Sequence, residues 1–189
     1  MAKTGKIAKK AKKLFKKKHG GKVKKYDALI ESALLDRDFV DRAVTKIGLS
    51  REELIEIAPV RFECCDYSHS LGDFQIRLFK DGMLRSSNYS VSLLFFGAKQ
   101  LFAYTYRFSL LGDNVSEKLA EIDYDAIRAV VSESEYQTIT DSSHTVFSVP
   151  TTCVQIVADG CKYDVFAPVG NSETESAILA LRALIRSKK

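Results

Sequence analysis

The spacing of hydrophobic positions along this chain changes near residue 60. Before that point apolar residues recur every three to four positions, which is the period of an amphipathic helix. After it they alternate with polar residues in several short runs, which is the period of a β-strand. A helical period returns from residue 172 onward. This order predicts an α+β protein in which helices precede an antiparallel sheet and one helix follows it.

Residues 26–57 carry the pattern of a small helical unit. Two apolar stripes follow each other here, and a break between them is expected near Asp36. Gly48 is expected to end the second helix. Residues 50–53 match a capping box that would open a third, short helix before Pro59. The unit is too small for a core of its own, so we expect it to pack on the strands that follow.

The strand pattern extends over nine short segments. They are residues 60–67, 74–79, 89–96, 101–111, 119–124, 127–132, 145–149, 153–158 and 161–166. Pro150 separates the seventh segment from the eighth, because proline interrupts a strand. Asp159 and Gly160 form a strong hairpin signal between the last two.

Residues 101–111 show the clearest alternation of the chain. Phe102, Tyr104, Tyr106 and Phe108 alternate with Ala103, Thr105, Arg107 and Ser109. This pattern predicts a buried aromatic face and a wetter opposite face of an antiparallel sheet. Substitution at Thr105 should therefore have little effect on stability.

The chain closes with an amphipathic helix. Asn171 or Ser172 is expected to cap it, and Glu175 completes a capping box. Its apolar stripe consists of Ala177, Ile178, Leu181, Leu184 and Ile185. We expect Ile178, Leu181 and Ile185 to pack against the aromatic face described above.

Consecutive antiparallel strands followed by one amphipathic helix form a recognisable order. Residues 87–187 resemble the pleckstrin-homology-type barrel of small bacterial PH-like domains, chiefly at residues 122–127, residues 161–166 and the terminal helix. The resemblance implies an antiparallel PH-like barrel or bent sheet capped by the C-terminal helix. It also implies a protein that recognises a membrane, a peptide or a partner protein, with the identity of that partner left open.

Charge divides the chain more sharply than hydropathy does. The first 25 residues contain twelve lysines and no acidic residue, whereas the other 164 carry 17 basic and all 24 acidic residues. The net charge of +5 therefore combines a basic N-terminal arm with an acidic body. The predicted organisation is an arm at residues 1–25, a helical unit at 26–58 and a PH-like β domain at 59–189.

The basic arm is the main functional clue, because a block of like charge attracts polyanions. Residues 4–18 read as a basic amphipathic helix that ends at Gly20 and Gly21. Its candidate residues for binding an anionic surface are Lys9, Lys10, Lys12, Lys13, Lys16 and Lys17. Ile7, Leu14 and Phe15 form an apolar stripe that could insert into a membrane.

Three functions fit this arm. The leading one is a non-catalytic adaptor, cytoplasmic and peripheral at the inner face of the membrane, whose arm binds anionic lipid. The alternative is non-specific association with nucleic acid, although the arm lacks the arginines that favour base contacts. The third is a solubilising tail without a partner.

Recognisable catalytic chemistry is missing from the sequence. The four cysteines, Cys64, Cys65, Cys153 and Cys161, follow no metal-ligand spacing and are expected to be free thiols. His69 and His144 lie in serine-rich segments that are predicted to be turns. No secretory signal or membrane span is expected. We therefore expect no enzyme activity, no metal and no cofactor.

Overall fold

The computed structural model describes residues 2–16, 19–48, 59–72, 74–140 and 145–188. The helices are α1 (Ala2–Phe15), α2 (Val23–Arg37), α3 (Phe39–Ile47) and α5 (Ser172–Lys188), with a short 3-10 turn at Tyr124–Ala126. The strands are β1 (His19–Gly21), β2 (Val60–Asp66), β3 (Ile76–Phe79), β4 (Leu84–Ser86), β5 (Asn88–Phe96), β6 (Gln100–Ser109), β7 (Val115–Asp123), β8 (Ile127–Thr140), β9 (Val146–Ala158) and β10 (Cys161–Pro168). The protein is thus α+β and ends in a helix, as predicted.

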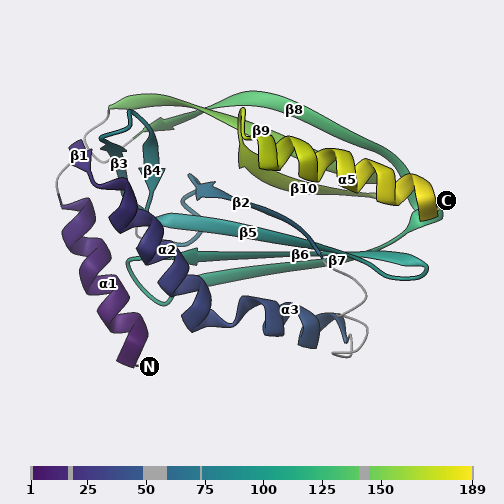
Figure 1. Ribbon diagram of the computed structural model, residues 1–189, viewed down its shortest axis with the longest axis horizontal. Coiled ribbons are helices and arrows are strands. Elements are labelled where there is room, and N and C mark those ends of the chain that lie inside the picture. Colours follow the sequence, from purple (N-terminus) through teal and green to yellow (C-terminus); the bar gives the residue numbers. More distant parts are fainter. Residues whose placement is uncertain (1, 17–18, 49–58, 73, 141–144, 189) are drawn as a thin grey trace.

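The described strands form three sheets, and none of the three closes into a barrel. The largest has the order β2-β5-β6-β7 and the next β10-β9-β8, both antiparallel throughout. A small sheet of order β1-β3-β4 pairs β1 in parallel with β3. Figure 1 shows α1, α2 and α3 on one side of the four-stranded sheet. The other side faces α5 and the β10-β9-β8 sheet, which is called the three-stranded sheet below.

The first two helices of the predicted helical unit form, as α2 and α3. The break between α2 and α3 falls at Asp38, whose φ of 45° interrupts the helix two residues after the expected position. Gly48 ends α3 in a left-handed conformation, and its N–H donates to the carbonyl of Val44 at 2.9 Å. The predicted capping box at residues 50–53 lies outside the described residues.

Strand β6 is buried on both faces, which corrects two predictions. Tyr104, Tyr106 and Phe108 do face a core, but that core is shared with α1 and α2 rather than with α5. Ile178, Leu181 and Ile185 of α5 pack instead with Leu101 and Ala103 on the opposite face. The expected wet face is therefore wrong, and Thr105 is only 5% exposed. The reason is that the four-stranded sheet lies between two apolar layers.

The segments on either side of Pro150 form one strand, β9, rather than two. β10 ends opposite Thr151, so the stretch of β9 that contains Pro150 pairs only with β8. Proline is tolerated in a strand where one side has no partner. β8 continues to Thr140 along the same ribbon, well beyond the predicted end at residue 132.

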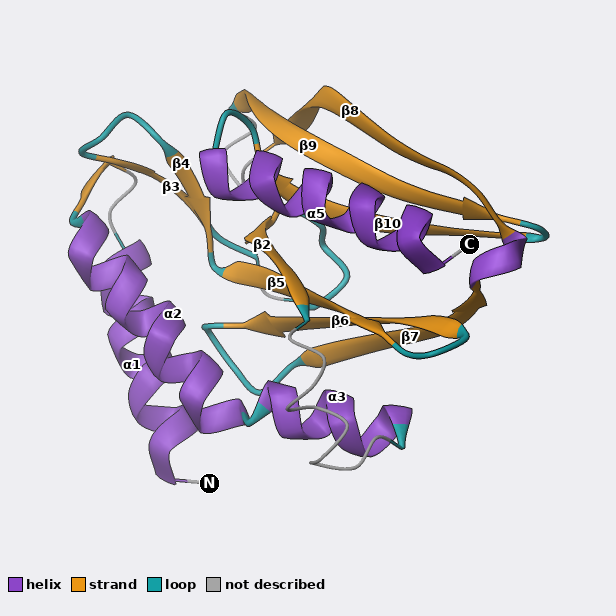
Figure 2. Ribbon diagram, turned by 45° about the vertical axis from the view of Figure 1, so that its right-hand side comes forward, coloured by secondary structure: helices purple, strands orange, loops and turns teal. Residues whose placement is uncertain are grey.

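The C-terminal helix α5 begins after Asn171, one of the two predicted caps, and buries its predicted apolar stripe. The side-chain oxygen of Asn171 accepts a hydrogen bond from the N–H of Glu173 at 2.9 Å, which makes Asn171 the cap. Ile178, Leu181 and Ile185 are buried in a cluster that includes residues of both large sheets. Figures 1 and 2 show α5 along the space between these two sheets.

Helix α1 packs against the body of the protein, where the sequence predicts a separate arm. Ile7, Ala11, Leu14 and Phe15 are buried in a cluster that also includes α2, α3, β5 and β6. The predicted boundary at residue 25 falls within α2, and the one at residue 58 lies outside the described residues. Ile7, Leu14 and Phe15, the candidates for membrane insertion, are occupied by contacts within the fold.

Candidate functional site: a basic groove between α1 and α2

A tight connection brings α1 and α2 together in antiparallel orientation. The chain leaves α1, pairs with β3 through β1, and reverses into α2 (Figure 1). Gly21 is required at this reversal, because a Cβ atom there would lie 2.7 Å from the Phe79 ring. Of the two glycines expected to end the basic helix, Gly21 thus lies in a close-packed corner.

Three aromatic rings fix this corner to the sheet. Phe15 of α1 makes edge contacts with Tyr26 of α2 and Phe79 of β3, with both pairs of ring centroids 6.3 Å apart. Tyr26 and Phe79 contact each other at 5.4 Å. Such edge-to-face pairs add about 0.5–1.5 kcal/mol each beyond the area that they bury. The aromatic triangle therefore holds the C-terminal end of α1 against the start of α2.

Polar contacts complete the attachment of α2. The hydroxyl of Tyr26 donates to the carbonyl of Ser86 at 3.0 Å and lies 3.2 Å from the Cys65 sulfur. Burial, followed by the nearby Cys65, raises the pKa of the Tyr26 hydroxyl, so this group stays neutral. The Arg85 guanidinium lies over the rings of both Tyr26 and Phe79, at 5.6 and 5.0 Å.

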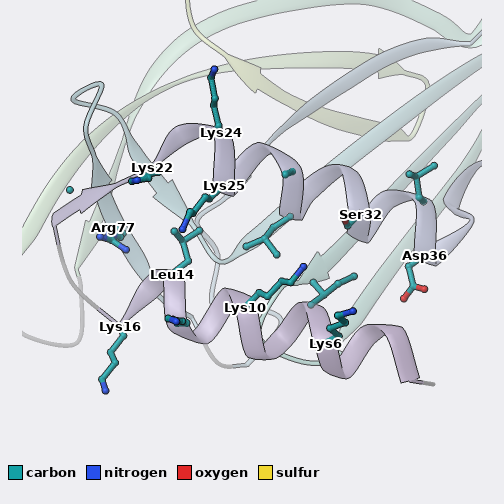
Figure 3. A pocket seen from close by; sticks show the side chains of 16 residues that line it. Lys6, Lys10, Leu14, Lys16, Lys22, Lys24, Lys25, Ser32, Asp36 and Arg77 are labelled. Carbon is teal, nitrogen blue, oxygen red and sulfur yellow. The ribbon is translucent and has the colours of Figure 1, made fainter.

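The two helices enclose an open groove of about 1070 Å3 (Figure 3). It is lined by Lys6, Ile7, Lys10, Lys13, Leu14, Lys16, Gly20, Lys22, Lys24, Lys25, Ala28, Leu29, Ser32, Leu35, Asp36 and Arg77. We call this feature the basic groove. Its volume lies slightly above the roughly 300–1000 Å3 that is typical of ligand sites.

The lining of the basic groove combines cations with an apolar floor. Seven lysines and Arg77 face a single carboxylate, that of Asp36. Ile7, Leu14 and Leu29 are largely buried beneath them. Lysine side chains can cover apolar surface with their stems while their ammonium groups stay in water. The groove can thus contact an apolar group and an anion at the same time.

Charge is distributed unevenly along the groove. Figure 3 places Lys16, Lys22, Lys25 and Arg77 near the end next to β1, and Asp36 toward the opposite end. Along α2 the lining changes from Lys24 and Lys25 through Ala28 and Ser32 to Leu35, which is 80% exposed, and ends at Asp36.

A second, smaller pocket of about 430 Å3 lies at the Leu35 end of the groove and shares Leu35 with it. Its lining includes three carboxylates, those of Glu31, Asp38 and Asp41, and one cation, Arg61. The basic character therefore ends where α2 meets α3.

The predicted surface-binding lysines fall into three groups. Lys10, Lys13 and Lys16 line the groove, whereas Lys9 and Lys12 are exposed but do not line it. Lys17 lies outside the described residues. The structure adds Lys6, Lys22, Lys24, Lys25 and Arg77 to the lining. The four lysines belong to the basic block seen in the sequence, but Arg77 comes from β3 and has no local signal that connects it to α1.

Other chemistry-bearing groups in the described part of the chain form no comparable site. No three His, Cys, Asp or Glu residues gather there in a way that could hold a metal ion. The four cysteines are free, and burial raises the pKa of the Cys64 thiol. None of the described helices is both long enough and apolar enough to cross a bilayer.

No protein-family model, curated protein or solved structure matches this chain. The functional argument therefore rests on the groove itself.

Proposed function

We propose that this chain is a non-catalytic binding protein that attaches to anionic membrane surfaces through the basic groove and the lysines around it. The observation that carries the proposal is the lining of the groove, in which eight cations and one carboxylate surround an apolar floor. The cytoplasmic leaflet has a negative surface potential, and each lysine near such a surface contributes on the order of 1 kcal/mol. The proposed location is therefore the inner face of the membrane.

The proposed attachment is electrostatic and leaves α1 in place. Ile7, Leu14 and Phe15 are buried against α2 and the sheet, so their insertion would require α1 to leave the core. Lys6, Lys10, Lys13 and Lys16 remain exposed along the docked helix. A docked helix presents these ammonium groups at fixed spacing, which lowers the entropic cost of binding. The resemblance to a PH-like domain stays a prediction, and the proposal does not depend on it.

Lipid suits the groove better than nucleic acid does. Phosphate groups of DNA or RNA would be neutralised by the lysines alone and would gain nothing from Leu14, Leu29 and Leu35. The apolar floor contributes only when the ligand brings an apolar group of its own. Binding to nucleic acid is therefore kept as the alternative result of the binding experiments below.

Co-sedimentation with vesicles tests the proposal. At low salt the protein should bind phosphatidylcholine vesicles that contain phosphatidylglycerol, and it should dissociate as the salt concentration rises. It should not bind vesicles of pure phosphatidylcholine. Replacing Lys10, Lys13 and Lys25 with Gln removes three groove cations and should weaken binding roughly 100-fold, at about 1 kcal/mol for each lysine.

A matched variant separates the groove from overall charge. Replacing Lys99, Lys162 and Lys188 with Gln removes the same charge from exposed positions outside the groove and should change binding little. Equal loss in the two triple variants would show that net charge alone drives attachment. Binding to duplex RNA or DNA with no binding to anionic vesicles would replace the membrane proposal with the nucleic-acid one.

A further inference from the structure

Charged and apolar residues lie at different ends of the basic groove, whereas binding to a flat anionic surface requires no such separation. Its cations concentrate around the β1 end, at Lys16, Lys22, Lys25 and Arg77 (Figure 3). Toward the other end the α2 side offers Ala28, Ser32 and Leu35. A ligand that matches this lining is anionic at one end and apolar along the rest of its length.

The apolar part of the groove can hold a segment of a lipid chain. From Ala28 to Leu35 the lining of α2 extends for about 10 Å at a rise of 1.5 Å per residue. This distance accommodates part of an extended acyl chain. The side chain of Leu35 is 80% exposed although it lines the groove, so an apolar ligand could cover it.

We propose that the basic groove holds one single-chain anionic lipid, with its acyl chain along Leu14, Leu29 and Leu35 and its headgroup among the cations at the β1 end. Charge complementarity fixes the sign of the headgroup, since the only carboxylate in the lining, Asp36, lies away from that end. The inference rests on the proposed function, because both use the same groove, and it names a specific ligand class for it.

The lysines of α1 are compatible with a chain in the groove. Lys6 and Lys10 lie opposite the uncharged part of α2, with their ammonium groups ending in blue in Figure 3. Their methylene stems can flank an acyl chain while the charged ends remain in water. Between Ala28 and Leu35 the apolar floor thus has a cationic rim on the α1 side and uncharged side chains on the α2 side.

Calorimetry with a soluble single-chain lipid tests the inference. Oleoyl lysophosphatidic acid, kept below its micelle concentration, should bind the full-length protein with one-to-one stoichiometry. Glycerol 3-phosphate, which lacks the chain, and oleoyl lysophosphatidylcholine, which lacks the net charge, should each bind at least tenfold more weakly. No saturable binding of the anionic lipid, or equal binding of all three ligands, would overturn the inference.

A blocking variant locates the site. Ala28 is exposed on α2 and lines the groove, so Ala28→Trp should fill part of it and weaken lysophosphatidic acid binding at least tenfold. Ala180→Trp places the same ring at an exposed position of α5 and should leave binding unchanged. Circular dichroism and melting temperature verify that both variants fold. Equal affinities of the two folded variants would overturn the location.

A fluorescent reporter gives a second readout. The chain contains no Trp, so Leu35→Trp introduces a single indole at the end of the groove opposite β1. Lysophosphatidic acid should shift the emission of this indole to shorter wavelength. The native Leu179 side chain on α5 is 66% exposed, and the emission of Leu179→Trp should not change with lipid. An unchanged Leu35→Trp spectrum at saturating lipid would contradict a chain that extends to this end.

The two proposals fail separately. Vesicle co-sedimentation and binding of the soluble lipid are measured separately on the unmodified protein, so each result bears on one proposal. Vesicle binding without lysophosphatidic acid binding would remove the single-lipid site and retain surface attachment. Lysophosphatidic acid binding without vesicle attachment would retain the single-lipid site and remove surface attachment.

Discussion

At the scale of single residues, a buried chain of hydroxyl groups links the two large sheets. Thr105 of β6 shares hydrogen bonds with the hydroxyls of Ser92 at 2.7 Å and Tyr163 at 2.8 Å. Tyr163 also donates to the carbonyl of Lys118 at 3.3 Å. Burial raises the pKa of Tyr163 to about 12, so the whole chain of hydroxyls is uncharged. Thr105 occupies the centre of this network.

Substitution at Thr105 measures the importance of the network. Thr105→Val keeps the shape but leaves the Ser92 and Tyr163 hydroxyls without their shared partner, so it should lower the free energy of unfolding by about 1–3 kcal/mol. Thr105→Ser retains the hydroxyl and should be the milder change. Urea denaturation of the three proteins provides the comparison. A valine variant as stable as the wild type would show that the hydroxyls need no common partner.

At the scale of elements, the decisive interaction is the docking of α1. Its stripe of Ile7, Ala11, Leu14 and Phe15 is short and includes an alanine, so much depends on its largest member. Phe15 is 5% exposed and contacts rings from both α2 and β3. Twelve lysines in the first 25 residues disfavour an isolated helix, since like charges repel along it. Tertiary contacts therefore stabilise α1.

Removing the Phe15 ring should release α1. Phe15→Ala loses about 3–5 kcal/mol of packing. Because proteolysis follows the population of the open state, tryptic cleavage between residues 6 and 16 should accelerate roughly 100-fold or more. Phe166→Ala, a half-buried change in β10, should leave cleavage of this segment unchanged. Identical cleavage rates in wild type and Phe15→Ala would mean that α1 does not depend on the aromatic triangle.

At the scale of the whole molecule, two apolar clusters share the four-stranded sheet. One lies between this sheet and α1, α2 and α3, and the other lies between it, the three-stranded sheet and α5. The alternating residues of β6 contribute to both clusters, for example Tyr104 to the first and Ala103 to the second. This shared layer should couple the helical side and the α5 side in unfolding.

Truncation of α5 tests the coupling. Leu181 is fully buried, so Leu181→Ala should destabilise the protein by about 2–5 kcal/mol. Leu179→Ala, on the exposed side of the same helix, should have an effect near zero. Near-ultraviolet dichroism and far-ultraviolet dichroism should give one coincident transition in both variants. Separate transitions would show that the three-stranded sheet and α5 unfold as an independent unit.

The local sequence pattern was sufficient to predict most helices and strands and part of the groove lining. The turn at Gly160, the cap at Asn171 and the end of α3 at Gly48 follow from turn and capping chemistry within a few residues. The lysine block already contained seven of the eight cations of the groove. Arg77 could not be assigned, because nothing near β3 indicates that it lies beside the start of α2.

The sequence by itself determined the order of helices and strands, the basic character of the N-terminus and which stripes are apolar. These properties are local, since a repeat of 3.6 or 2 residues is complete within one segment. Only the tertiary structure decided what each stripe contacts. The stripe of Ile7, Leu14 and Phe15 would gain from a bilayer as well as from a protein core, because burial of apolar area is non-directional. Tyr26 and Phe79, distant in sequence, supply the complementary surface that places α1 on the sheet and leaves its lysines around a groove.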